Sequence, residues 1–274
     1  MQTVKSDKRV LATCLVVLGW SMLSSTTVFA AEVDLQKLQA MVQREADARD
    51  IQNLMSRRAH LQAAGDNSWV ELFARKQADV SWYMNGSYKI GYDTIKNTFM
   101  PSGTERAQRN LESMIKVYPD IENKPENYGV GEFREHALLS PLIIVADDGR
   151  TAKGFWHSVG PQLAFRNGEA NGTVGYEKYG VDFIKEDGEW RFWHMATYTE
   201  IYIELGKTLA EQVPMPGSTQ AKEREGATPN PYPAWTPWRV PKQVPLPVPY
   251  KTFSETFSYG PSPEQVKAAM ADKK

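Results

Sequence analysis

Residues Thr151–Glu204 carry the strongest indication of the fold: TAKGFWHSVGPQLAFRNGEANGTVGYEKYGVDFIKEDGEWRFWHMATYTEIYIE. It contains segments rich in β-branched and aromatic residues at 151–166, 173–186 and 190–204, and a fourth such segment precedes it at 133–146. The Asn-Gly and Asp-Gly dipeptides between the segments are typical of tight hairpin turns. The stretch therefore predicts an antiparallel meander, with turns at 147–149, at Asn167-Gly168 and Asn171-Gly172, and at Asp187-Gly188.

Helical patterns precede this sheet. From Asp34 to about Gln62, apolar residues recur at the spacing of an amphipathic helix, and Ser68–Ala74 predicts a second, short helix. The other predicted elements are a hairpin of 78–84 and 87–90 across Asn85-Gly86, helices at 92–99 and 105–117, and a loop at 119–131. Helices followed by successive hairpins predict an α+β fold in which a bent antiparallel sheet wraps the helices.

Composition excludes several classes of protein. With 32 basic and 33 acidic residues among 274, the chain lacks the broad positive field that nucleic acids demand, so we expect no nucleic-acid partner. The single cysteine, Cys14, excludes a disulfide framework and a cysteine metal cluster. No two of the four histidines have metal-ligand spacing, so we predict no metal site.

The N-terminus has the layout of a secretory signal peptide. Lys5, Lys8 and Arg9 precede an apolar run from Val10 to about Leu23, and small residues end at Ala30. This pattern predicts a leader at 1–30, cleavage after Ala30, and a periplasmic or secreted protein. The alternative is a membrane anchor, but the run is shorter than the roughly 20 apolar residues that span a bilayer. We expect no membrane partner after cleavage.

The rest of the chain divides into a domain at 31–210, with an inserted helix and loop at 100–130, and a C-terminal extension at 211–274. The segment Pro229–Pro263 holds ten of the 17 prolines, interleaved with seven aromatic residues. Such proline density excludes helix and central strand. We expect the extension to lie across the domain or across a neighbouring subunit of a homo-oligomer, a dimer or trimer. A disordered proline-rich tail is the alternative.

Several short motifs accompany this order of elements. They are Arg58–Asp66 followed by Trp69 and Leu72-Phe73, Gly91 with Ile95, His136 with Ser140-Pro141, Asp148-Gly149 with Ala152, and Tyr179 with Phe183, Asp187-Gly188 and Trp190-Arg191. Together they resemble the SnoaL-like branch of the nuclear transport factor 2-like (NTF2-like, cystatin-like) superfamily over about residues 40–204. The resemblance implies a cone-shaped α+β barrel around one deep, mostly apolar pocket.

The resemblance also implies an activity. Members similar to scytalone dehydratase, bile-acid dehydratase and hexachlorocyclohexane dehydrochlorinase perform eliminations without a cofactor. The long form with an aromatic, proline-rich tail resembles the diarylpropane lyases and γ-formaldehyde lyases that act on lignin-derived aromatics. It implies a cofactor-free lyase, or an isomerase, for a hydrophobic aromatic small molecule. Because a fold does not fix a reaction, a non-catalytic binding or assembly module is the alternative.

His136 is the strongest catalytic candidate, because histidine exchanges protons near neutral pH and this one matches the family's catalytic histidine. The dehydratase-type members place Tyr and Asp on the first helix where this chain has Arg58 and Ala63, so their Asp–His pair is absent. Arg58 cannot act as a base, but it can stabilise an oxyanion. The alternative is a surface arginine beside Arg57. Tyr179 matches a family tyrosine and can donate to a substrate oxygen. The alternatives are a hydrogen-bonded core histidine at His136 and an ordinary core tyrosine at Tyr179.

The remaining candidates rest on strand periodicity. A period-two count places one set of residues on a single face: Trp190, Phe192, His194, Ala196 and Tyr198. Either His194 or His157 can then face the pocket, and the resemblance favours His194 as a catalytic group. Trp82, Tyr83, His157 and Tyr198 are predicted substrate contacts. An aromatic lining with few ionisable groups favours a flat phenolic or polycyclic substrate.

Overall fold

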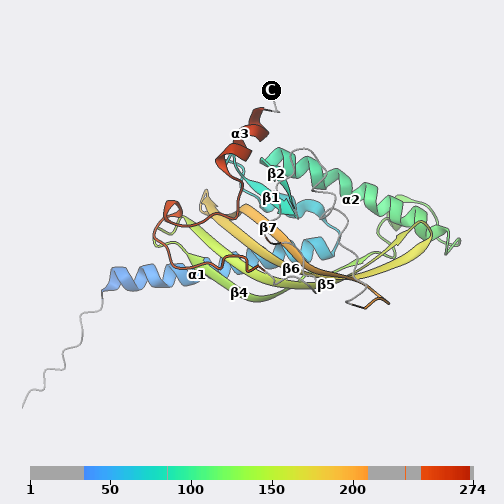
Figure 1. Ribbon diagram of the computed structural model, residues 1–274, viewed down its shortest axis with the longest axis horizontal. Coiled ribbons are helices and arrows are strands. Elements are labelled where there is room, and N and C mark those ends of the chain that lie inside the picture. The colour runs from blue at the N-terminus through green and yellow to red at the C-terminus, as the bar shows by residue number, and fades with distance from the viewer. Residues whose placement is uncertain (1–33, 85, 209–231, 233–241, 272–274) are drawn as a thin grey trace, which may run out of the picture.

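A computed structural model describes residues 34–84, 86–208, 232 and 242–271, together with the backbone but not the side chains of 101–103. The predicted leader and the tail residues 209–231 and 233–241 lie outside the described residues. Within the described residues, no helix is both long enough and apolar enough to cross a membrane. Figure 1 shows a strongly curved sheet with α1 (Leu35–Ala63) lying along it.

The sheet has seven strands: β1 (Ser81–Met84), β2 (Ser87–Ile90), β3 (Phe133–Arg134), β4 (Ala137–Val145), β5 (Thr151–Arg166), β6 (Glu169–Glu186) and β7 (Glu189–Glu204). Its order is β2-β1-β7-β6-β5-β3, and β4 also pairs with β5. Every pairing is antiparallel except that of β1 with β7. The predicted α+β fold with a curved meander is confirmed, as a sheet that does not close into a complete barrel.

Two of the predicted turns are two-residue hairpins. Asn167-Gly168 joins β5 to β6 and Asp187-Gly188 joins β6 to β7, and all four residues have positive φ. The predicted turn at Asn171-Gly172 is wrong, because Asn171 lies inside β6 and pairs with Ala164 of β5. The chain has already reversed at Asn167-Gly168, so the second Asn-Gly dipeptide continues the ladder.

The helical elements are α1, a 3-10 helix η1 (Asn67–Leu72), α2 (Tyr92–Ile115), the short η2 (Pro125–Asn127) and η5 (Phe253–Glu255), and α3 (Pro263–Ala271). The prediction of separate helices at 92–99 and 105–117 is wrong, because α2 continues through Pro101. A proline removes one backbone donor inside a helix. Packing of α2 against η1, β2 and β5 holds the helix together despite that loss.

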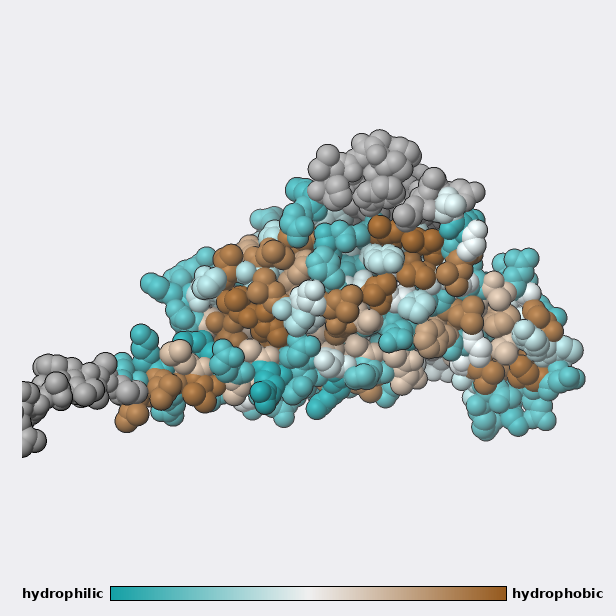
Figure 2. Space-filling model, turned by 90° about the horizontal axis from the view of Figure 1, so that it is seen from below, coloured by the Kyte–Doolittle hydropathy of each residue, from teal (hydrophilic) through white to brown (hydrophobic). Residues whose placement is uncertain are grey.

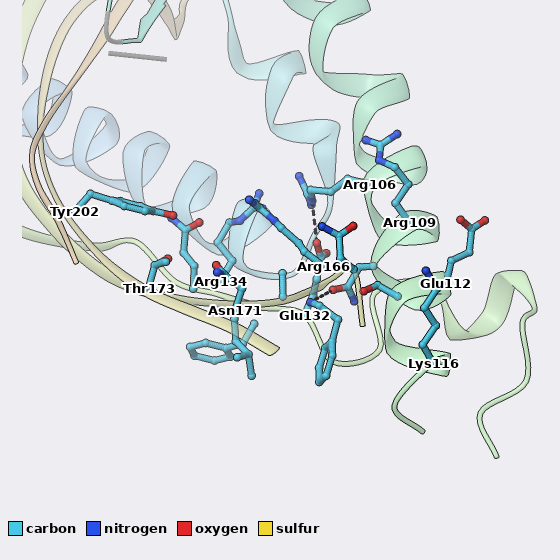
Figure 3. Close-up of a pocket in the computed structure, with 18 residues that line it drawn as sticks. Arg106, Arg109, Glu112, Lys116, Glu132, Arg134, Arg166, Asn171, Thr173 and Tyr202 are labelled. Atoms are coloured by element: carbon cyan, nitrogen blue, oxygen red, sulfur yellow. Dashed lines mark hydrogen bonds and ion pairs between the residues drawn. The ribbon is translucent and has the colours of Figure 1, made fainter. Parts of the chain in front are cut away.

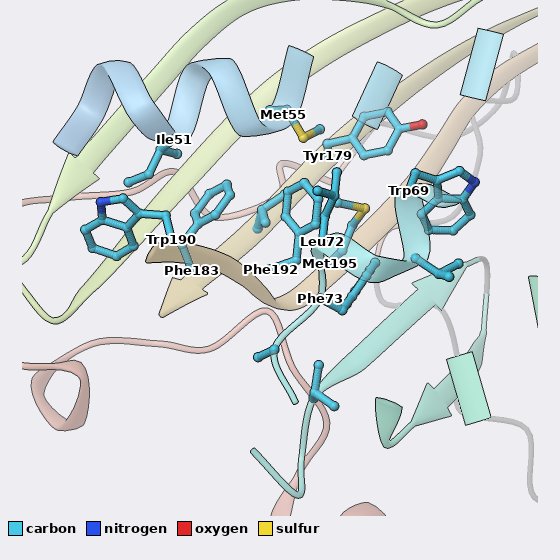
Figure 4. Packing of buried hydrophobic residues seen from close by; sticks show 14 of the residues in the cluster. Ile51, Met55, Trp69, Leu72, Phe73, Tyr179, Phe183, Trp190, Phe192 and Met195 are labelled. Atoms are coloured by element: carbon cyan, nitrogen blue, oxygen red, sulfur yellow. The ribbon is translucent and has the colours of Figure 1, made fainter. Parts of the chain in front are cut away.

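The main core lies between α1, η1 and the concave face of the sheet (Figure 4). Asp47, Ile51, Met55 and Arg58 are the buried residues of α1 and recur at helical spacing. Asp47 accepts hydrogen bonds from the indole of Trp190 at 2.9 Å and the ammonium of Lys185 at 2.8 Å. This buried stripe fixes the rotation of α1 and turns Arg58 toward the concave side.

The other face of the sheet is covered by the described part of the tail. Residues 242–262 pass along this outer face (Figure 1) and form a second cluster with Tyr83, Phe155 and Tyr198. The Tyr259 hydroxyl donates to the Pro245 carbonyl at 2.7 Å. This part of the extension therefore lies across its own domain.

The first turns of α1 project beyond the sheet (Figure 1). Leu35, Leu38, Met41 and Val42 are exposed there. Figure 2 shows apolar residues at this end of the helix. The amphipathic pattern of α1 therefore starts before the helix reaches the core.

Candidate active site

A pocket of about 360 Å³ lies on the concave side of the sheet. Its aromatic and aliphatic wall includes Trp69, Trp82, Met84 and Phe99. Its polar wall contains Arg58 from α1, His136 from the segment between β3 and β4, and Glu177 and Tyr179 from β6. Three of the four predicted catalytic residues therefore meet in one place, together with Trp82.

His136, Glu177 and Tyr179 form a connected polar group. Nδ1 of His136 lies 3.3 Å from Oε2 of Glu177, and the Tyr179 hydroxyl donates to the same oxygen at 3.0 Å. All three side chains are more than nine-tenths buried. Because Nδ1 faces the carboxylate, Nε2 is the nitrogen that can exchange a proton with a bound molecule.

Arg58 is buried at 2% exposure, so the alternative of a surface arginine is wrong. Its guanidinium carbon lies 4.9 Å from the ring centre of Tyr179 and 5.4 Å from that of Trp69. Its Nε and Nη1 are buried without a hydrogen-bond acceptor among the described residues. Unsatisfied buried donors are costly, so Arg58 has hydrogen-bonding capacity that the described residues do not use.

The charges of the group favour an ionised Glu177. Burial alone would raise the pKa of Glu177, but the hydrogen bond and charge of His136, with smaller contributions from Tyr179 and Arg58, hold it below its usual value. Burial is also the largest influence on Tyr179 and raises its pKa, and the Glu177 charge adds to this rise. Tyr179 is therefore a neutral donor, and Glu177 is the fixed negative charge beside His136.

A second cavity of about 630 Å³ adjoins the pocket and shares five lining residues with it: Arg106, Arg109, Arg134, Gln162 and Tyr202. Figure 3 shows the arginine side chains of α2, β3 and β5 around this cavity. The prediction of a lining with few ionisable groups is wrong, since four arginines line the first pocket alone. Their positions on separate elements hid them from strand periodicity.

Four other predicted site residues lie on the outer face. His194, Tyr83 and Tyr198 are buried there, and His157 is exposed beside Phe155. A β-bulge explains the error for His194: Phe183 pairs with Phe192, whereas Asp182 pairs with His194, so Trp193 is an extra residue in β7. Phe192 faces the core and His194 faces the tail, because one inserted residue reverses the alternation.

His194 belongs to a buried ionic cluster under the tail. Its Nδ1 lies 2.8 Å from Oδ2 of Asp182, and Nζ of Lys153 lies 2.5 Å from Oδ1 of the same carboxylate. The Ser258 hydroxyl and the Tyr259 backbone amide, both from the tail, also donate to Oδ2 of Asp182. This cluster fastens the extension to the sheet and lies on the opposite face from His136.

Glu177 is the site residue that sequence reasoning missed. The first helix has Ala63 where the family motif has aspartate, so no carboxylate partner for His136 is expected from α1. Strand alternation puts Glu177 on the same face as Tyr179, since the two residues are two apart on one strand. The strand position of Glu177 could have been found from the sequence, but its role beside His136 is seen only in the structure.

The described residues contain no group of three or more histidine, cysteine, aspartate or glutamate residues that could hold a metal ion. The polar groups that line the pocket are instead suited to proton transfer and to binding negative charge.

The family is shown by a sequence model of the SnoaL-like domain that matches residues 43–196. This range is more than half of the chain, and the protein belongs to that family. No curated protein matches the chain.

Similar solved structures include a candidate scytalone dehydratase from Novosphingobium aromaticivorans, with 16% identity, 61% of this chain and 93% of that chain covered, and a TM-score of 0.42. An NTF2-like protein with a cystatin-like fold from the same species has 18% identity, covers 65% and 94%, and has a TM-score of 0.40. A hexachlorocyclohexane dehydrochlorinase from Novosphingobium barchaimii has 11% identity, covers 61% and 95%, and has a TM-score of 0.42.

Proposed function

We propose that the protein is an exported, cofactor-independent lyase of the elimination, dehydration or retro-aldol type, acting on a hydrophobic aromatic small molecule. The observation that carries this proposal is the convergence of His136, Glu177, Tyr179 and Arg58 on one pocket with an aromatic wall. An elimination through an oxyanion or phenolate requires a group that transfers a proton, here His136, and a cation that stabilises the developing negative charge, here Arg58.

Each residue has a defined task in this proposal. Nε2 of His136 removes a proton from the substrate, and Glu177 stabilises the resulting imidazolium through Nδ1. The electron pair that is released forms the new double bond as the leaving group departs, and the imidazolium can return the proton to the leaving oxygen. Arg58 holds the oxygen that gains charge, and Tyr179, whose hydroxyl donates to Glu177, keeps that carboxylate in place.

Glu177 also bears on the alternative of a non-catalytic binding or assembly module. That alternative gained support from the missing helix-1 carboxylate. In the structure, a buried carboxylate from β6 contacts His136 instead. The site thus has a carboxylate–histidine pair assembled from different elements, which favours the enzyme.

The test is incubation of residues 31–274 with a panel of phenolic dimers and steroids, read by mass spectrometry without added cofactor. We expect loss of water or formaldehyde from a phenolic compound. His136→Ala and His136→Gln should each lower kcat by about a hundred- to ten-thousand-fold, since general acid–base catalysis contributes on that order. His60→Gln is the matched control, because His60 is exposed on α1. Turnover by His136→Gln at the parental rate would refute the assignment.

A further inference from the structure

The cavity beside the candidate site has an excess of positive charge. Arg106, Arg109, Lys116, Arg134 and Arg166 line it, against Glu112 and Glu132. Arg106 is neutralised, because its Nε donates to Oε1 of Glu132 at 2.9 Å. Arg134 and Arg166 have no carboxylate within ion-pair distance among the described residues. The cavity therefore holds cations that its own carboxylates do not neutralise.

Arg134 lies where the two cavities meet. It lines both of them, and it precedes His136 by two residues along the chain, on the same side of the backbone. Two residues of extended chain span about 7 Å, which is roughly the length of one substituted aromatic ring. A molecule whose reacting part contacts His136 can thus reach Arg134 with its other end.

The electrostatic environment of Arg134 is unfavourable in the empty pocket. Burial lowers the pKa of its guanidinium, and the charges of Arg106 and Arg166 lower it further, while Glu132 and Tyr202 only partly compensate. Guanidinium nevertheless stays protonated at any physiological pH. A bound anion would relieve this repulsion, and a carboxylate matches the planar fork of an arginine.

We propose that the substrate carries a carboxylate that binds Arg134, supported by Arg166, while its phenolic end occupies the pocket of His136 and Arg58. This inference rests on the proposed function, because it names the class of aromatic molecule that the same site takes. The substrate class is then an aromatic acid of about two rings, matched to two joined cavities of about 360 and 630 Å³.

The test measures binding, so that it does not depend on turnover. The probes are 4-hydroxystilbene-4′-carboxylate and its methyl ester, titrated by calorimetry against the full chain and its variants. We expect the carboxylate to bind the parent about ten-fold or more tightly than the ester, as a charge-assisted hydrogen bond allows. Arg134→Gln should remove that preference and leave the affinity for the ester within about twofold. Arg57→Gln is the control, because Arg57 is exposed on α1 outside both cavities.

Equal affinities of the parent for acid and ester would overturn the inference, as would a preference for the acid that survives Arg134→Gln. Absence of binding by either probe would also overturn it. The proposed lyase function is judged separately, by turnover in the His136 variants. If His136→Gln turned over substrate normally while Arg134 still selected the acid, the catalytic assignment would fail and the carboxylate site would stand.

Discussion

Replacing Asp182 by asparagine should release the C-terminal extension from the sheet. The Asp182 carboxylate is fully buried and contacts Lys153, His194, Ser258 and the Tyr259 amide. Burial would raise the pKa of Asp182, but the hydrogen bonds and charges of His194 and Lys153 outweigh it and hold the pKa below its usual value. Asp182→Asn keeps the shape of the side chain and removes the charge that both cations require.

The expected loss of stability depends on Lys153, whose positive charge stays buried without its carboxylate partner. Nζ of Lys153 is completely buried, and the ring centres of Phe253 and Phe257 lie 4.6 Å from it. Breaking a buried ion pair by removing one partner typically costs about 3–5 kcal/mol, because the other charge stays desolvated and unpaired. For a domain of this size, that loss corresponds to a fall in Tm of roughly 6–20 °C.

Urea unfolding followed by circular dichroism measures the loss, and trypsin cleavage at the exposed Lys251 reports release of the tail. The double variant Lys153→Met with Asp182→Asn is the control, because replacing both partners of a buried pair is often neutral or stabilising. The double variant should therefore be more stable than Asp182→Asn alone. A single variant within about 1 kcal/mol of the parent, or a double variant no better than the single, would refute the reasoning.

Three further outcomes are expected. Burial lowers the pKa of His194, but Asp182 and Asp79 raise it above the usual value. The contribution of His194 to folding stability is therefore full below about pH 6.5 and falls as pH rises. His194→Gln should thus lower the free energy of unfolding more at pH 5.5 than at pH 9, and an equal loss at both pH values in urea unfolding would contradict this. Arg58→Lys should lower kcat about ten- to hundred-fold in steady-state assays, since the charge remains but the fork is lost; an unchanged kcat would exclude Arg58 from charge stabilisation. N-terminal sequencing of the exported protein should begin at Ala31; a chain that keeps Met1 in the membrane would contradict the leader.

The fold follows from signals that are local in sequence. The turns at Asn167-Gly168 and Asp187-Gly188 are two-residue hairpins whose positive φ values suit asparagine, aspartate and glycine, so both the turns and the strands that flank them are predictable. Local sequence does not predict that α2 continues through Pro101, because this continuity depends on packing against η1, β2 and β5. Asn171-Gly172 is the same dipeptide as the turn four residues earlier, and only its pairing with β5 distinguishes it from a turn.

The candidate site was only half predictable for a related reason. Arg58, His136 and Tyr179, which belong to the family motifs, line the pocket together with Trp82. The prediction for His194 is wrong because the bulge at Trp193 reverses the faces of β7. No residue type in Phe192-Trp193-His194 indicates a bulge. Tyr83 and Tyr198 fail because both faces of this sheet are buried, one by α1 and one by the tail.

The carboxylate that contacts His136 comes from Glu177 on β6, whereas the family motif places an aspartate on the first helix. With the acid on β6, Glu177 and Tyr179 are held two residues apart in a central strand paired on both sides, so their orientation is more rigid than at a helix end. Arg58 stands on α1 where the family motif has tyrosine, and it brings a buried positive charge within 5 Å of the Tyr179 ring centre. A base and a cation on one wall suit a reaction in which negative charge builds up on oxygen as the proton leaves.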